Sequence, residues 1–140
     1  ARHHGPVGCF IHLHPASGDG QPPAAEKAVV KHVFLLAKHL TRALTDAAQQ
    51  GRSCFLTVTR LDGALGLGRS GPFGPVGGGL FGLTKTLALE WPGVFCRAVD
   101  ISPGFTDEQS ANVILAELHD PNRLVVETAW GELGRVTLRA

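Results

Sequence analysis

Short apolar runs, separated by longer and partly polar segments, make up most of this sequence. The runs are too short for typical helices, and several are continuously apolar, as in strands that are buried on both faces of a sheet. Strands are predicted in this way over residues 7–13, 54–59, 94–101, 124–129 and 135–138. Residues 15–25 and 63–79, which are rich in proline and glycine, are predicted as loops.

Helical features occupy the segments between these runs. The predicted helices cover residues 24–50, 78–90 and 106–118. The first repeats apolar side chains every three or four residues and ends at Gly51, and the third begins with the capping-box pair Thr106 and Gln109. The order β-α-β-α-β-α-β-β predicts an α/β fold in which helices cover both faces of a mainly parallel sheet.

Composition limits the classes of protein to which the chain can belong. Its 140 residues suit one domain, predicted over residues 1–140, with a real core. The formal net charge of +1 argues against a nucleic-acid or anionic-membrane binder. With 44% hydrophobic and 18% charged residues, the chain is not predicted to be disordered. No apolar run approaches the roughly 18 residues of a membrane span and no signal peptide is recognisable, so we expect a cytoplasmic protein.

Residue types that are absent or few narrow the chemistry further. The sequence has no tyrosine, which excludes any mechanism that uses a phenol, and no methionine, so the chain is either trimmed or a piece of a longer polypeptide. Cys9, Cys54 and Cys96 are an odd number of cysteines in apolar runs, which predicts buried free thiols in a reducing compartment. A disulfide or a reactive thiol is the alternative.

Two segments match the pattern Gly-x-Gly-x-x-Gly, at residues 66–71 and 77–82. The second is followed about twenty residues later by Asp100 near the end of a strand, as in dinucleotide-binding sites. Those sites need a strand that leads directly into the first glycine, whereas Pro72 and Pro75 precede the second motif here. We therefore interpret the glycines as positions of close helix packing or loop flexibility, with nucleotide binding as the alternative.

The histidines, serines and aspartates are the candidates for metal binding and catalysis. His12 and His14 have strand spacing and are expected on one face, but a zinc site needs three or four ligands and no third is indicated. The other histidines, which show no partner motif, are His3, His4, His32, His39 and His119. No serine lies in a nucleophile elbow. Asp62, Asp100 and Asp107 follow strand ends and are interpreted as turn and cap residues.

Residues 78–106 resemble the short-chain dehydrogenase/reductase superfamily, in which an active-site helix with a Gly-Leu-Thr-Lys core precedes a strand and a Pro-Gly turn. The helix core is present here at residues 82–85, and the turn is present at Pro103-Gly104. Residues 7–14 resemble the fourth strand of that family, and residues 24–50 the helix after it. The resemblance implies a truncated Rossmann-like fold that corresponds to the second half of such an enzyme, without its glycine-rich cofactor loop.

The residues that carry the chemistry in that family differ in this sequence. The family's Tyr-x-x-x-Lys pair falls on Phe73 and Gly77, and its serine on Arg60 or Leu61. Phenylalanine cannot protonate a carbonyl, and glycine cannot lower the pKa of a phenol or hold a ribose. The family's Asn-Ala-Gly after the fourth strand is replaced by His14-Pro15-Ala16. We therefore assign no catalytic, cofactor-binding or metal-binding residue.

A reductase-like half without its chemistry resembles the structural subdomain of a ketoreductase in a bacterial type I polyketide or polyunsaturated fatty acid synthase. The resemblance implies a non-catalytic scaffold that stabilises and positions an adjacent ketoreductase, which uses NADPH to reduce β-ketoacyl chains. This chain alone is then expected to bind no cofactor and to have no enzymatic activity.

The same resemblance implies the partners of the chain. They are the catalytic ketoreductase subdomain and other synthase domains, including the acyl carrier protein, and a homodimer of the parent synthase stays open. Neither nucleic acid nor a membrane is expected as a partner. The alternative functions are a small nucleotide-binding oxidoreductase and a stand-alone interaction or dimerisation module.

Overall fold

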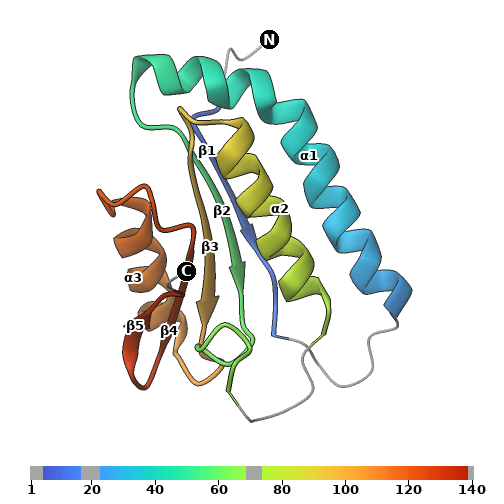
Figure 1. Cartoon of the computed structure of the whole chain (residues 1–140), viewed down its shortest axis with the longest axis vertical. Coiled ribbons are helices and arrows are strands. Elements are labelled where there is room, and N and C mark those ends of the chain that lie inside the picture. Colours follow the sequence, from blue (N-terminus) through green and yellow to red (C-terminus); the bar gives the residue numbers. More distant parts are fainter. Residues whose placement is uncertain (1–4, 17–22, 69–73, 139–140) are drawn as a thin grey trace.

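Eight elements follow one another in the order β-α-β-α-β-α-β-β (Figure 1). The computed structural model describes residues 5–16, 23–68 and 74–138. The strands are β1 (Cys9–Leu13), β2 (Cys54–Thr59), β3 (Phe95–Ile101), β4 (Glu127–Gly131) and β5 (Gly134–Val136). The helices are α1 (Pro23–Gln50), α2 (Val76–Glu90) and α3 (Asp107–Leu118).

All five strands belong to one sheet, in which they lie in sequence order. Strands β1 to β4 are parallel, and β5 returns antiparallel to β4. Helices α1 and α2 cover one face of the sheet and α3 lies on the other (Figure 1). The predicted α/β architecture is therefore confirmed. Strands β2 and β3 are buried along their whole length because helices cover both of their faces.

The larger part of the core lies between the sheet and helices α1 and α2. Leu44 of α1, Leu80 of α2 and Phe55 of β2 are fully buried in it, and the edge of the Trp91 ring meets Phe55 at 5.8 Å between ring centres. A buried hydrogen bond of 2.7 Å joins the hydroxyl groups of Thr57 and Thr84, so that the β2–α2 contact also has a fixed polar point.

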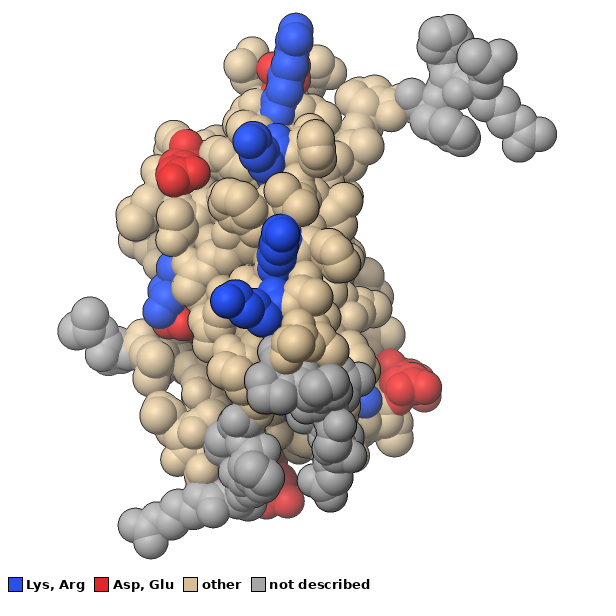
Figure 2. All heavy atoms as spheres, turned by 90° about the vertical axis from the view of Figure 1, so that its right-hand side faces the viewer, with Lys and Arg blue, Asp and Glu red and all other residues tan. Residues whose placement is uncertain are grey.

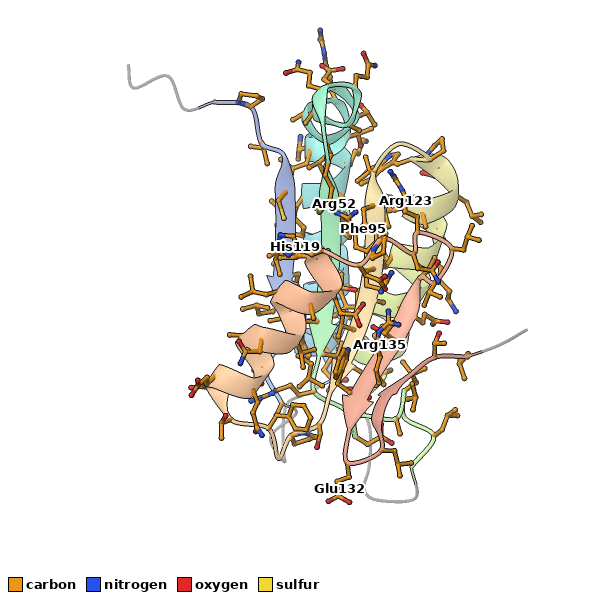
Figure 3. All side chains as sticks on the ribbon, turned by 90° about the vertical axis from the view of Figure 1, so that its left-hand side faces the viewer. Arg52, Phe95, His119, Arg123, Glu132 and Arg135 are labelled. Atoms are coloured by element: carbon orange, nitrogen blue, oxygen red, sulfur yellow. The ribbon has the colours of Figure 1, made fainter. Side chains whose placement is uncertain are left out.

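On the face of the sheet that carries α3, a buried ion network connects α3, β4 and β5 to β3. Arg97 of β3 is fully buried and pairs with Glu117 of α3 and, at 3.0 Å, with Asp120. Trp130 of β4 donates to Glu117 at 2.7 Å, and Arg135 of β5, which Figure 3 shows on this face, donates to the same carboxylate at 2.7 Å. One buried carboxylate thus holds three elements against β3.

Several element boundaries differ from the predicted ones. Strand β1 begins at Cys9 rather than at residue 7, and β5 covers Gly134–Val136 rather than residues 135–138. Helix α2 begins at Val76 rather than at residue 78. Gly77 is part of the helix because, without a side chain, it can pack closely against Leu61. Strand β4 covers Glu127–Gly131 rather than residues 124–129, because Leu124 is exposed and its N–H donates to the Asn122 side chain in a turn. In the described part of the chain, no helix is long and apolar enough to cross a bilayer.

Candidate functional site

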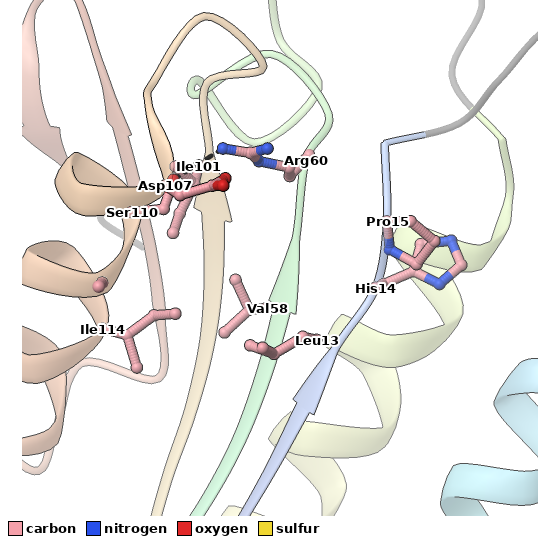
Figure 4. A pocket seen from close by; sticks show the side chains of 10 residues that line it. Leu13, His14, Pro15, Val58, Arg60, Ile101, Asp107, Ser110 and Ile114 are labelled. Carbon is pink, nitrogen blue, oxygen red and sulfur yellow. Dashed lines mark hydrogen bonds between the residues drawn. The ribbon is translucent and has the colours of Figure 1, made fainter.

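The carboxyl ends of β1, β2 and β3 meet at one edge of the sheet, where parallel α/β sheets usually hold their sites. A cleft of about 440 Å³ lies there between β1 and α3 (Figure 4). Its floor is apolar, with Leu13, Val58 and Ile101 from the strands and Ile114 from α3. Residues at the carboxyl ends of three strands and in the first turns of α3 face the same space in this cleft.

Arg60, one of the two residues on which the family's serine was expected to fall, extends from the end of β2 across this cleft (Figure 4). Its guanidinium donates to the Phe105 carbonyl at 2.9 Å and to the Ser110 hydroxyl at 2.7 Å. The guanidinium therefore joins β2 to the loop before α3 and to the first turns of that helix.

Asp100 and Asp62 are brought together, but both carboxylates face the backbone of the loop at residues 60–68. Asp100 is buried at the end of β3 and accepts the N–H groups of Leu61 at 2.7 Å and Leu65 at 3.0 Å. Asp62 accepts N–H groups from Ala64, Gly66 and Gly68 at 2.8, 2.8 and 2.7 Å. The interpretation of these aspartates as turn residues is confirmed.

The two carboxylates differ in their affinity for protons. Burial raises the pKa of Asp100 above its ordinary value, and the hydrogen bond to Asp62 adds to the rise. Burial acts in the same direction on Asp62, but the backbone N–H groups of Gly66, Ala64 and Gly68 outweigh it and leave its pKa below the ordinary value. Asp62 is therefore the more readily ionised of the two, and the loop backbone stabilises its charge.

Asp107 is the third aspartate that follows a strand end, and it lies in the first turn of α3 at the rim of the cleft. There its charge complements the positive end of the helix dipole. Thr106 and Gln109 form the predicted capping box, with the Gln109 N–H donating to the Thr106 hydroxyl at 3.2 Å and the Thr106 N–H donating to the side-chain Oε1 of Gln109 at 2.8 Å. These residues begin the helix, as predicted.

The second glycine motif, residues 77–82, lies within α2. A Cβ on Gly77 would lie 2.9 Å from a Leu61 methyl group, and a Cβ on Gly79 would lie 3.0 Å from Val30, so these glycines permit close packing. No strand leads into the motif from the described residues, since β2 ends at Thr59 and residues 60–68 and 74–75 are outside strands and helices. The first motif, residues 66–71, lies only partly within the described residues, and Phe73 lies outside them.

The start of α2 already has a carboxylate beside it. A Cβ on Gly74 would lie 2.5 Å from the Glu26 Oε1 atom, which places this carboxylate against the chain just before the helix. Negative charge at this position interacts favourably with the helix dipole. A phosphate brought to the same helix end would meet the Glu26 charge.

His12 and His14 lie on one face of the chain as predicted, with 6.0 Å between their ring centres. Burial lowers the pKa of both imidazoles, and the mutual repulsion of the two rings contributes at His12. In the described residues, no group of three or more His, Cys, Asp or Glu side chains could hold a metal ion. In Figure 4 the His14 ring points away from Arg60, so the histidines and the cleft's polar residues do not converge.

The three cysteines are free thiols, but they are not all buried. Cys54 and Cys96 are buried, and burial raises the pKa of Cys96 to about 12. Cys9 is exposed, contrary to the prediction, because it lies in the edge strand β1, on the face of the sheet where α3 covers β2 and β3 but not β1. Partial burial raises the pKa of the Cys9 thiol, and the interaction with the Cys54 thiol adds to the rise.

The sequence predicted the strand that contains Arg97 and the helix that contains Glu117, but not the ion network between them. The signal in the sequence was one charged residue inside the apolar strand of residues 95–101, because a buried charge requires partners. Those partners, Glu117, Asp120 and Arg135, follow at distances along the chain that no motif describes.

Comparison with known proteins supports the resemblance of residues 78–106. No protein-family model matches the chain. One of the subunits of the polyunsaturated fatty acid synthase of a Thraustochytrium species is 33% identical over 120 residues, which cover 81% of this chain and 4% of that relative. The crystal structure of a short-chain dehydrogenase/reductase from Brucella ovis matches with a TM-score of 0.54 at 20% identity, over 85% of this chain and 65% of that one.

The chain has a short-chain dehydrogenase/reductase-like fold and is homologous to part of a polyunsaturated fatty acid synthase subunit. It spans a small part of the synthase relative and just under two thirds of the reductase. Within this reductase-like chain, the turn Pro103-Gly104 is exposed at the carboxyl edge of the sheet, with the Gly104 N–H donating to the Ser102 hydroxyl at 3.3 Å. Arg60 and Gly77, two of the residues on which the resemblance places the family's catalytic positions, contact other parts of the chain.

Proposed function

We propose that this chain is a non-catalytic scaffold subdomain that stabilises and positions an adjacent NADPH-dependent ketoreductase in a polyketide or fatty acid synthase. The observation that carries the proposal is the structural use of the family's catalytic positions. Arg60 joins β2 to α3, and Gly77 packs against the Leu61 side chain, with no room for a larger residue unless Leu61 moves. Homology to a synthase subunit supplies the context.

The residues of this chain fit NADPH poorly. Asp100, the acidic residue that a dinucleotide site would need, is buried and engaged by the backbone of residues 61–65. The Glu26 carboxylate lies beside the start of α2, where a pyrophosphate would otherwise find the positive end of a helix. We therefore assign cofactor binding and hydride transfer to the neighbouring ketoreductase.

The open edge of the sheet offers a surface for that neighbour. Among the residues that the structure describes, strand β1 pairs with β2 on one side only, and its other side carries the backbone groups of an unpaired strand. Ile11 and Leu13, on the face that α3 leaves open, are 37% and 61% exposed. If the neighbouring ketoreductase paired with or covered this edge, apolar surface would be buried between the two. This burial would stabilise the ketoreductase, as we propose. Other synthase domains, such as the acyl carrier protein, would reach the chain through this assembly.

A cofactor titration tests the absence of chemistry. We expect no NADPH binding by the chain in fluorescence or calorimetric titrations, because the acidic residue and the helix end are engaged within the fold. We also expect that Phe73→Tyr combined with Gly77→Lys gives no turnover of a model ketone. Micromolar affinity for NADPH, or measurable turnover, would contradict the proposal and support the alternative of a small oxidoreductase.

A substitution at the sheet edge tests the scaffold role in a longer polypeptide that contains the adjoining ketoreductase region. We expect Ile11→Glu with Leu13→Glu to lower the melting temperature of the ketoreductase and its activity, because charges at a covered edge must be desolvated. Leu89→Glu, on the outer side of α2 at 84% exposure, is the matched control and should leave both quantities near the wild-type values. Equal behaviour of the two variants would favour a stand-alone interaction module instead.

A further inference from the structure

The outward face of α1 carries a row of four cations, which Figure 2 shows as a column along the helix. Lys27, Lys31, Lys38 and Arg42 follow one another at intervals of four, seven and four residues. At 3.6 residues per turn these intervals keep the side chains in one narrow stripe, about 22 Å long. The opposite face of α1 is the one that packs into the core, through Val33, Ala37 and Leu44.

Three of these cations differ from the other basic residues that the structure describes. Outside α1, each described Lys or Arg contacts a carboxylate or a backbone carbonyl within the chain, as is seen for Arg52, Arg60, Lys85, Arg97, Arg123 and Arg135. On α1, Arg42 lies 3.6 Å from Asp46. Lys27, Lys31 and Lys38 form no ion pair with any carboxylate of the described residues within 4.0 Å.

Apolar side chains occupy the longer gap in the row. Phe34 is 51% exposed and Leu35 is 38% exposed, and both lie between Lys31 and Lys38. Neither belongs to the buried clusters of the core. The outer face of α1 therefore has cations at both ends and an apolar centre, which is the arrangement of a small protein interface with a polar rim.

We propose that this face of α1 is a docking surface for an amphipathic helix of a partner protein. The partner helix would carry carboxylates at the same intervals of four, seven and four residues, with an apolar side chain in the seven-residue gap to cover Phe34. The carboxylates would pair with Lys27, Lys31, Lys38 and Arg42. This inference goes beyond the scaffold role and does not depend on it, because the scaffold role rests on the edge strand β1 and on the other face of the sheet, not on the outer face of α1.

The charge pattern favours a protein helix over a membrane or a nucleic acid. A membrane-bound helix inserts a wide apolar face, whereas the apolar face of α1 is turned to the core and the exposed large apolar residues are the three consecutive residues Phe34, Leu35 and Leu36, which point in different directions around the helix. A nucleic acid is bound through many phosphate contacts, whereas this row offers four cations in a chain of net charge +1. A partner helix with four carboxylates at the same helical spacing would match both the length of the row and the number of its cations.

Titration with synthetic peptides tests the proposal on the whole chain. The probe is a labelled, alanine-rich helical peptide with glutamates at the intervals given above and one leucine in the gap, and the readout is fluorescence anisotropy at low salt. We expect Lys31→Glu with Lys38→Glu to weaken binding about tenfold or more, since like charges replace two ion pairs. Phe34→Ser should weaken it severalfold, and salt should weaken it for the wild-type chain.

Two controls separate this docking from general attraction between charges. Lys85→Glu, on α2, reverses a lysine that already pairs with Glu127 at 3.0 Å, and it should change the affinity less than twofold. A peptide of the same composition with its glutamates spread around the helix should bind at least fivefold more weakly. Equal binding of the two peptides would overturn the proposal. So would stronger binding to phosphatidylserine vesicles or to duplex DNA that is lost in the Lys31→Glu, Lys38→Glu variant.

Discussion

Arg97 illustrates how one residue inside an apolar strand determines the packing of several elements. Its side chain is fully buried in β3, and it contacts Glu117, Asp120 and the Asn122 carbonyl, the last at 2.7 Å. The Phe95 ring lies 4.8 Å from the guanidinium and covers one of its faces. A charge in this position is stable only because anions and a carbonyl replace the water that it loses.

Substitution of Arg97 by methionine should therefore destabilise the fold strongly. We expect the free energy of unfolding to fall by about 3 to 5 kcal/mol, because Glu117 keeps its charge in a buried place and loses one of its cations. Urea denaturation followed by circular dichroism measures the change.

Arg42→Met is the matched control for this substitution, because Arg42 forms an exposed pair with Asp46 at 3.6 Å. An exposed pair of this kind contributes about 0.3 to 0.5 kcal/mol. If the two variants lost similar amounts of stability, the network around Arg97 would not have the structural role described above.

At the scale of elements, α3 has the clearest local instructions in the sequence. The capping box of Thr106 and Gln109 fixes its start, and Asp107 adds negative charge to its first turn. Its position on the sheet has a different origin, since Arg60 and the Glu117 network attach its two ends to β2, β3 and the C-terminal hairpin.

Removal of the cap should weaken α3 without disturbing the rest of the core. We expect Thr106→Ala to lower the free energy of unfolding by about 1 kcal/mol, since one N–H group of the first turn loses its acceptor. Hydrogen exchange should rise first in α3.

Thr86→Ala is the control, because Thr86 is an exposed residue inside α2 whose hydroxyl donates to the Gly82 carbonyl at 3.0 Å. Alanine has the higher helix propensity, so this variant should be as stable as the wild type or slightly more stable. A loss of stability equal to that of Thr106→Ala would mean that the cap contributes nothing.

Over the whole molecule, the ion network makes the fold sensitive to acid. Burial by itself would raise the pKa of Glu117 and Asp120. The hydrogen bonds of Arg135 and Trp130 to Glu117, and those of the Asn122 N–H and Arg97 to Asp120, outweigh burial and hold both pKa values below the ordinary ones. A carboxylate with a lowered pKa in the folded state stabilises the fold above its unfolded-state pKa, and this contribution is lost as the pH falls through the folded-state pKa.

We therefore expect the free energy of unfolding to decrease steeply as the pH falls below the ordinary Glu117 value of 4.5. Asp120→Asn should lower the stability at neutral pH and should reduce this slope, because one of the two carboxylates no longer takes up a proton. Urea unfolding measured at a series of pH values gives both quantities. A slope unchanged in the variant would contradict the contribution of Asp120.

The amino-acid sequence by itself determined the helices and strands of this protein. It also determined that the residue types which carry the chemistry in the reductase family are replaced at the expected positions. Apolar runs and helical repeats depend on neighbours in the sequence, so β2 was predicted with its observed bounds and α1 to within one residue. Phe73 and Gly77 at the family's Tyr and Lys positions could likewise be identified without coordinates.

Only the tertiary structure decided what the polar residues do. It placed Asp100 against the backbone of residues 61–65, joined Arg97 to Glu117, and left Cys9 exposed. It also showed that the cations of α1 lie on its outer face without partners among the described carboxylates, apart from the Arg42–Asp46 pair. These outcomes depend on contacts between segments that are far apart in the chain. A periodic pattern in one segment gives the direction of a side chain from its own helix or strand, but not the group that it meets there.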